Sequence, residues 1–338
     1  MNYYLLRCGS NGKYQLGLGD DEDKDHLVEE KLNWEPSKIA CGGNHTLVLS
    51  TDGYIYGCGD NSKGQCGIDD VPVVPNLTAV PKVGGSDWTD VAAGWQFSLL
   101  LNENRELWVC GEGFSGELGL GKKMYQTKLT KIPGIWDIDQ IETSIHSVMI
   151  KLKGGQLYGW GNNRKGLLNL DSDRIIWEPQ LIDEQVKQVS LARSFSVVVK
   201  EGSLSVKGKT DIQCKLDPKE ISFLSTMWSS LHFIEKNKLH SMGNNSHGQI
   251  FYDGLSVENI EQISLGSEHG LILYANHSVS AWGWGEHGNC GQKPIENKDR
   301  PTDEQVTYSL NEIYNGSRPV KFIQGGCATS WIVVSDVS

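Results

Sequence analysis

The sequence predicts an all-β protein, a seven-bladed β-propeller closed by the N-terminal strand, which completes the last blade. Three observations predict this fold. A glycine-led motif recurs seven times along the 338 residues, a second motif recurs seven times between its copies, and the chain begins with the strand that the last repeat lacks. A repeat of about 50 residues that holds short strands is typical of a propeller blade. We therefore expect residues 1–338 to form a single seven-bladed domain.

The first motif consists of an aromatic residue or Cys, a lead glycine, a polar turn and a second pair of glycines. Cys58-Gly59-Asp60-Asn61 with Gly64-Gln65-Cys66-Gly67 is a clear copy. No Lys-Ser/Thr follows these glycines, so they indicate tight turns and not a phosphate-binding loop. The lead glycines assigned from the sequence are Gly9, Gly59, Gly111, Gly161, Gly208, Gly243 and Gly285, of which the copy at Gly208 is degenerate.

The second motif is Gly-x-x-His or a relative, followed by an apolar strand. Its copies are Gly42-Gly43-Asn44-His45, Gly94-Trp95-Gln96-Phe97, Thr143-Ser144-Ile145-His146, Ala192-Arg193-Ser194-Phe195, Met227-Trp228-Ser229-Ser230, Gly266-Ser267-Glu268-His269 and Gly326-Cys327-Ala328-Thr329. Apolar runs such as Leu47-Val48-Leu49 follow the motif and indicate buried strands. Hairpin signals such as Thr51-Asp52-Gly53 come after most of these runs.

The two ends of the chain are expected to share one blade. The last repeat ends at Val334 and lacks the strand that should precede its next lead glycine. Tyr3-Tyr4-Leu5-Leu6-Arg7-Cys8, at the start of the chain, is that strand. Pairing the two seals the ring and removes the open edges that an extended sheet would expose.

Composition excludes several classes of function. The net charge of −11 and the pI near 5.3 disfavour direct binding to the phosphates of nucleic acids. No apolar stretch reaches the ~20 residues of a membrane span, and residues 1–8 resemble a strand more than a signal peptide. The eight cysteines contain no C-x-x-C pair, so we expect an intracellular protein with free thiols and no membrane association.

The histidines invite a metal or catalytic interpretation. His45, His146 and His269 are read as one repeat position in three different blades. The structural interpretation is that each bonds backbone at a strand start, whereas a metal site would require them to converge at the central channel. No Ser/His/Asp set or carboxylate pair stands out above the repeat background. We expect no catalytic residue, no metal on this chain and no cofactor.

Strand parity predicts which residues share a face. In an antiparallel blade the turns alternate between two faces, so the Gly-x-x-His turn and the Gly-x-Asn turn open on the same one. Trp95 and Trp228 share a turn position there, and aromatic residues on a polar rim are typical of binding hot spots. The alternative is that each tryptophan plugs the channel mouth. The predicted partner-binding residues are Asn44, Trp95, Gln96, Trp228, Glu268, His269, Trp284, Glu286, His287 and Cys327.

These motifs resemble the regulator of chromosome condensation family of seven-bladed propellers over essentially the whole chain, most weakly over residues 204–240. Within that family the resemblance narrows to members that pair with a small CSL-type metal-binding protein. The strings that carry it include Ile39-Ala40-Cys41-Gly42-Gly43-Asn44-His45, Gly266-Ser267-Glu268-His269-Gly270 and, the most specific, the nine residues from Gly283 to Gly291.

The resemblance implies a heterodimer with a small zinc- or iron-binding CSL-type protein, in which the metal lies on the partner. It further implies a non-enzymatic role in the Elongator-dependent modification of wobble uridine in tRNA and in diphthamide synthesis on elongation factor 2, in cytoplasm and nucleus. One alternative is a guanine-nucleotide exchange factor for a small GTPase. Against it, the chain lacks the basic N-terminal tail and the inserted hairpin of the family's founder. A substrate-recruiting propeller of a larger assembly, such as a ubiquitin ligase, is the other alternative.

Overall fold

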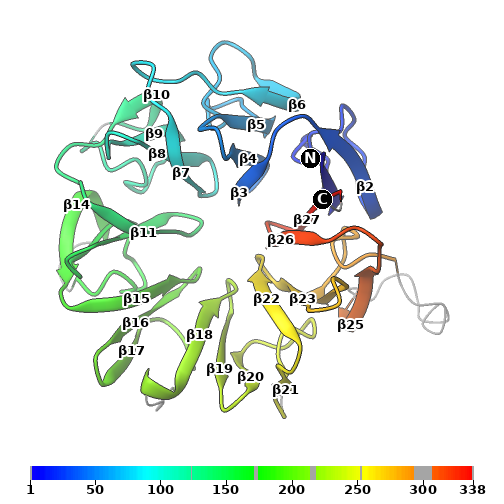
Figure 1. Cartoon of the computed structure of the whole chain (residues 1–338). Helices are drawn as coiled ribbons and strands as arrows, with labels where there is room; N and C mark the ends of the chain where they lie inside the picture. Colours follow the sequence, from blue (N-terminus) through cyan, green and yellow to red (C-terminus); the bar gives the residue numbers. More distant parts are fainter. Residues whose placement is uncertain are drawn as a thin grey trace.

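The computed structural model describes residues 2–122, 124–170, 174–213, 218–251, 253–292 and 307–336. Across these residues the strands form seven antiparallel sheets. The sheets stand like blades around a central axis, and the two termini meet in one blade (Figure 1). The predicted fold class is confirmed. The one helical element in the described ranges is the 3₁₀ turn η1 (Pro218–Glu220), and no described helix has the length and apolarity to cross a membrane.

The first three blades have four strands each. Blade 1 contains β3 (Pro36–Cys41), β4 (His45–Ser50), β5 (Ile55–Asp60) and β6 (Val73–Ala79). Blade 2 contains β7 (Trp88–Ala93), β8 (Phe97–Asn102), β9 (Leu107–Glu112) and β10 (Gln126–Lys131). Blade 3 contains β11 (Ile138–Thr143), β12 (Ser147–Leu152), β13 (Leu157–Asn162) and β14 (Ile175–Asp183).

The remaining blades vary at their outer edge. In the described residues, blade 4 contains β15 (Val186–Leu191), β16 (Phe195–Lys200) and β17 (Ser203–Gly208) and no fourth strand. Blade 5 contains β18 (Ile221–Thr226), β19 (Ser230–Glu235), β20 (Lys238–Gly243) and the short β21 (Leu255–Ser256). Blade 6 contains β22 (Ile260–Leu265), β23 (His269–Tyr274), β24 (Val279–Trp284) and β25 (Thr307–Tyr314). Blade 7 contains β26 (Val320–Gly325), β27 (Thr329–Ser335), β1 (Tyr3–Gly9) and β2 (Lys24–Leu32).

The core lies between neighbouring blades. The second strand of a blade is covered by a blade on each side, which explains why all six residues of β4 are buried. Outer strands such as β2 instead consist mainly of half-buried and exposed residues. Trp160 of blade 3 is fully buried and its Nε1 donates to the Glu117 carbonyl of blade 2 at 2.8 Å. Contacts of this kind fix each blade against the next.

The N-terminal strand closes the ring as predicted. β1 pairs with β27 from Tyr3 opposite Ser335 to Gly9 opposite Thr329, and on its other side with β2. Leu5 and Cys8 of β1 are fully buried. The first strand of the chain therefore contributes core side chains as well as backbone pairing to blade 7.

The structure corrects one lead glycine. In each blade this glycine lies opposite the first residue of the second strand, as Gly59 lies opposite His45. In blade 6 the residue opposite His269 is Gly283 and not Gly285. Its φ is +97°, and a Cβ there would lie 2.6 Å from the Glu268 carbonyl oxygen, so only glycine fits. The overlapping pairs Trp282-Gly283 and Trp284-Gly285 made the sequence ambiguous.

Candidate binding face at the channel mouth

One face of the propeller carries two kinds of turn, and we call it the turn face. It bears the turns between the first and second strands of each blade and the loops between the third and fourth. The Asp60 amide donates to the Asn44 carbonyl at 2.8 Å, and the Trp284 amide donates to the Glu268 carbonyl at 2.9 Å. These bonds join the two kinds of turn in blades 1 and 6. The predicted parity is therefore confirmed.

Backbone hydrogen bonds between blades hold the turns around the channel mouth. Trp95 accepts a bond from the Gly43 amide at 3.1 Å and donates its own amide to Ile145 at 3.3 Å. Trp228 likewise accepts from the Arg193 amide at 3.2 Å and donates to Ser267 at 2.8 Å. Each tryptophan is thus fixed at its backbone to the blades on both sides.

Trp95 and Trp228 contact one another although they come from blades 2 and 5. Their ring centroids lie 5.9 Å apart with an interplanar angle of 55°. Both side chains are half-buried. Gly43 permits this arrangement, because a Cβ on it would lie 2.7 Å from Cδ2 of the Trp95 indole. The two tryptophans share one face as predicted, but they pack together across the channel mouth and are not separate exposed rings.

Several other predicted site residues join neighbouring blades. The Glu268 carboxylate accepts from Ser229 Oγ at 2.7 Å and from Gln249 Nε2 at 3.1 Å, both in blade 5. Burial raises the pKa of Glu268. Trp284 stacks on His247 of blade 5 with centroids 4.2 Å apart.

Five more predicted residues lie on the turn face. His287 Nδ1 lies 2.8 Å from Asp23 Oδ2 of blade 7, and Glu286 beside it is exposed. Asn44, Gln96 and Cys327 are half-buried in their turns. Burial raises the pKa of the Cys327 thiol to about 11, which makes it a poor nucleophile at neutral pH.

His269 is an exception among the predicted site residues, because it lies inside the protein. It is 1% exposed and its Nε2 lies 3.0 Å from Ser330 Oγ of blade 7. His45 is equally buried, with Nε2 2.8 Å from Ser98 Oγ of blade 2. The Nε2 partner of each ring is a serine hydroxyl, and His269 also interacts with the Thr329 backbone, as expected for a histidine at a strand start. Burial lowers the pKa of both histidines to about 4, so both are neutral at pH 7.

His146 does not share the position of the other two histidines. Blade 3 closes its turn with a bond from the Ser144 amide to the Ser147 carbonyl, so Ser147 begins the strand and His146 precedes it. His146 is half-exposed, and its Nδ1 lies 2.8 Å from Glu117 Oε1. The three rings do not converge. In the parts of the chain that the structure describes, no three His, Cys, Asp or Glu side chains are grouped to hold a metal ion.

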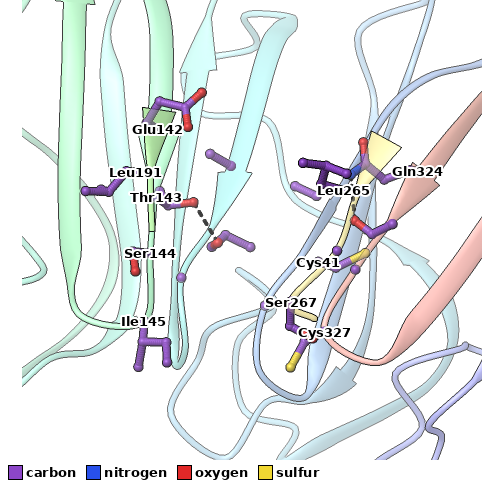
Figure 2. A pocket seen from close by; sticks show the side chains of 18 of the residues that line it. Cys41, Glu142, Thr143, Ser144, Ile145, Leu191, Leu265, Ser267, Gln324 and Cys327 are labelled. Atoms are coloured by element: carbon purple, nitrogen blue, oxygen red, sulfur yellow. Dashed lines mark hydrogen bonds between the residues drawn. The ribbon is translucent and has the colours of Figure 1, made fainter. Parts of the chain in front are cut away.

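A polar cavity of about 310 Å³ lies in the channel beneath the tryptophan pair. Figure 2 shows its wall, with Glu142, Thr143 and Ser144 on one side and Cys41, Gln324 and Cys327 on the other. The Glu142 carboxylate accepts from Gln140 Nε2 at 3.0 Å, and burial raises its pKa to about 7. Burial also raises the pKa of Cys41 to about 12. The cavity holds no strong nucleophile at neutral pH among its described residues.

An aromatic cluster on the turn face was missed by the sequence analysis. Phe114 is 63% exposed, and its ring lies 5.7 Å from that of Tyr125, which in turn lies 6.0 Å from Trp177. Phe114 and Tyr125 belong to the β9–β10 loop of blade 2, and Trp177 meets them because blade 3 places β14 beside that loop. Phe114 is the sequence signal that could have pointed to the cluster, because the matching turn positions of other copies carry small or polar residues such as Ser62, Arg164 and Ser246.

The closed ring of seven blades, each with a lead glycine at the same position, defines a β-propeller built from sequence repeats. Profiles of the Regulator of chromosome condensation (RCC1) repeat match residues 5–49, 52–101 and 154–199, and a second set matches 37–65 and 88–117. An RCC1 repeat-containing protein of Schizosaccharomyces pombe is 31% identical over 98% of this chain and 99% of its own length. The chain belongs to the RCC1 repeat family.

One further sequence relative and two solved structures are similar to this chain over most of its length. A secretion-regulating guanine nucleotide exchange factor of Mus musculus is 27% identical over 89% of this chain and 67% of its own length. The crystal structure of Prp20p from Saccharomyces cerevisiae superposes with a TM-score of 0.83 at 17% identity, covering all of this chain and 92% of Prp20p. Human WBSCR16 gives the same TM-score at 14% identity, over 99% of this chain and all of that one. At these low identities, the similarity to the two structures concerns the fold and not the function.

Proposed function

We propose that the protein is a non-enzymatic adaptor whose turn face docks a small CSL-type metal-binding protein. Through that partner it would support Elongator-dependent modification of wobble uridine in tRNA and diphthamide synthesis on elongation factor 2. The proposal draws on the run from Gly283 to Gly291, which resembles that of the yeast α-tubulin suppressor, also called a killer-toxin-insensitivity protein. The observation that carries it is the Trp95–Trp228 pair at the centre of the turn face.

The turn face has the physical character of a docking surface. Its central tryptophans are fixed through their backbone to both neighbouring blades, so binding would cost little ordering entropy there. Around them stand polar groups such as Gln96 and Glu268, which suits an apolar centre with a polar rim. Phe114 extends the apolar surface toward the outer rim.

Calorimetric titration of a CSL-type partner against variants of this chain tests the proposal. Trp228→Ala is expected to weaken binding by about thirtyfold, the effect of a ~2 kcal/mol hot spot. Phe114→Ala removes an exposed ring, so it reports on the same face without disturbing the core. Trp136→Ala is the matched control. It removes an equally exposed side chain, 65% against 63%, from the link between β10 and β11 on the opposite face.

Each variant should first be compared with the wild type by its melting temperature, because Trp228 packs on Trp95. Weaker binding by Trp228→Ala or Phe114→Ala, with unchanged melting and normal binding by Trp136→Ala, supports the proposal. If only Trp136→Ala loses affinity, the opposite face binds the partner. If the wild type does not bind the CSL-type protein at all, the adaptor role fails.

Guanine-nucleotide exchange is the second candidate function. It is favoured by the similarity to a secretion-regulating guanine nucleotide exchange factor over most of the chain. An exchange factor accelerates nucleotide release from its GTPase at substoichiometric concentration, whereas an adaptor does not. Release of a fluorescent guanine nucleotide from a panel of small GTPases separates the two. Acceleration that Trp228→Ala abolishes would favour exchange on this same face.

A further inference from the structure

Blade 4 presents an open strand edge. The third strand of every other blade is followed by an outer strand that pairs with it, although β21 of blade 5 pairs over only two residues. In blade 4 the described residues supply no such strand, so β17 stands at the edge of a three-stranded sheet. The third strand lies between two others in the other blades, whereas no described strand pairs with the outer side of β17.

The register identifies the backbone groups that point outward. β17 pairs with β16 from Phe195 opposite Gly208 to Lys200 opposite Ser203. The Lys209 amide donates to the Ser194 carbonyl at 2.9 Å, which sets the alternation of the antiparallel ladder. Ser203, Ser205 and Lys207 therefore bond inward to β16. The amide and carbonyl groups of Leu204 and Val206 point away from the blade.

We propose that this edge accepts an extended segment of a partner protein as the missing fourth strand of blade 4. Strand addition satisfies unpaired backbone groups with main-chain hydrogen bonds, and side chains at alternate positions give specificity. Leu204 and Val206 lie half-buried against the core of blades 4 and 5. Apolar residues at alternate positions of the added strand would continue that packing.

The positive charges beside the open edge indicate which side chains should stand between the apolar residues of the added strand. Lys207 belongs to β17 and Lys209 follows its last residue, and neither forms an ion pair with any other described residue. Acidic side chains between the apolar ones would find these two cations. The partner segment is therefore extended, alternately apolar and acidic. A second copy of this chain is disfavoured, because two molecules of net charge −11 repel one another.

The outer strands of other blades carry the residues that usually protect an edge. β6 contains Pro75, and β14 contains Pro179 together with Glu178 and Asp183. Proline and charge discourage edge-to-edge pairing. β17 has the sequence Ser-Leu-Ser-Val-Lys-Gly, with no proline and no acidic residue. Lys207 is the single charged residue of β17. A lysine disfavours pairing with another cationic edge but favours pairing with an acidic strand, so the protection of this edge is selective.

Hydrogen exchange resolved by residue tests the open edge, with a synthetic peptide of alternating valine and glutamate as the probe. In the free protein the Leu204 and Val206 amides should exchange quickly while those of Ser205 and Lys207 are protected. Adding the peptide should slow exchange at Leu204 and Val206. If those two amides are already as protected as Ser205 in the free protein, the chain covers its own edge and the proposal fails.

Substitutions and altered peptides give the specificity controls. Val206→Pro removes an outward amide without removing a bond to β16, and should weaken peptide binding by about tenfold. Val206→Thr keeps the amide and should bind normally. Because Val206→Pro could disturb folding, a peptide N-methylated along one edge provides the test on the unaltered protein. We expect binding to be lost when the methyl groups lie on the peptide edge that faces β17, and to be kept when they lie on the opposite edge. Equal binding by peptides methylated on either edge, or by a valine–lysine peptide, overturns the proposal.

Discussion

At the scale of single residues, burial decides the chemistry of the titratable groups. His45 and His269 are held neutral inside the blades, each beside a serine hydroxyl. Glu142 shows the opposite case in the channel. Its carboxyl group has its pKa raised to about 7 by burial, against 4.5 in the free side chain. The folded protein therefore keeps a proton on Glu142 at pH values where the unfolded chain has released it.

The raised pKa of Glu142 makes the free energy of unfolding depend on pH. Between about pH 4.5 and 7 the folded state binds more protons at Glu142 than the unfolded state, so this group lowers stability as pH rises. Glu142→Gln cannot ionise and should raise the free energy of unfolding at pH 8, by on the order of 2 kcal/mol. The gain should nearly vanish at pH 4.5. Urea unfolding at both values measures it, with exposed Glu258→Gln as control. An equal gain at both pH values would contradict the burial argument.

The sequence could predict residue roles only where the repeat is unambiguous. The turn positions of Asn44 and Trp95 could be predicted because the motif around them is clear. Gly283 was misassigned because two tryptophan–glycine pairs overlap, and only the pairing with His269 distinguishes them. Contact between Trp95 and Trp228 could not be predicted either, because it depends on the diameter of the ring.

At the scale of elements, the blades were predictable and their outer edges were not. Second strands are buried on both sides and read as apolar runs, so they mark each blade. Outer strands are polar and leave no periodic signal. Only 35 residues separate Gly208 from Gly243, and in the structure this interval lacks the fourth strand of blade 4 in its described residues. The short spacing was the available sign of the open edge.

The closing strand is the element whose loss should be most damaging. Deleting residues 1–8 would remove the partner of both β2 and β27 and the buried side chains of Leu5 and Cys8. We expect insolubility or a melting temperature lowered by many degrees, because lost core residues typically cost ~2 kcal/mol or more each. Deleting only residues 1 and 2, which precede β1, is the control. A truncated protein that melts like the wild type would refute closure by β1.

At the scale of the whole molecule, the acidic surface and the ring architecture limit the kinds of partner. The ring gathers the described turns and loops of its blades on one face, attached to rigid blades, which suits recognition of another folded protein. The net charge of −11 works against polyanions at long range. Even a protein that serves tRNA modification would then act through its partner and not by holding the RNA itself.

Titration with RNA tests this last inference. Fluorescence anisotropy with a labelled tRNA should show no binding tighter than ~100 μM at 150 mM salt, the weak end of non-specific association. Lowering the salt to 50 mM should not produce micromolar affinity, because few phosphates would be neutralised. Micromolar binding that falls steeply with salt would contradict the inference. It would point to a local basic surface, and Lys122 and Arg174 beside Trp177 would then be the first residues to replace. Loss of RNA binding in Lys122→Ala and Arg174→Ala, with CSL-type partner binding retained, would place the two ligands on separate surfaces.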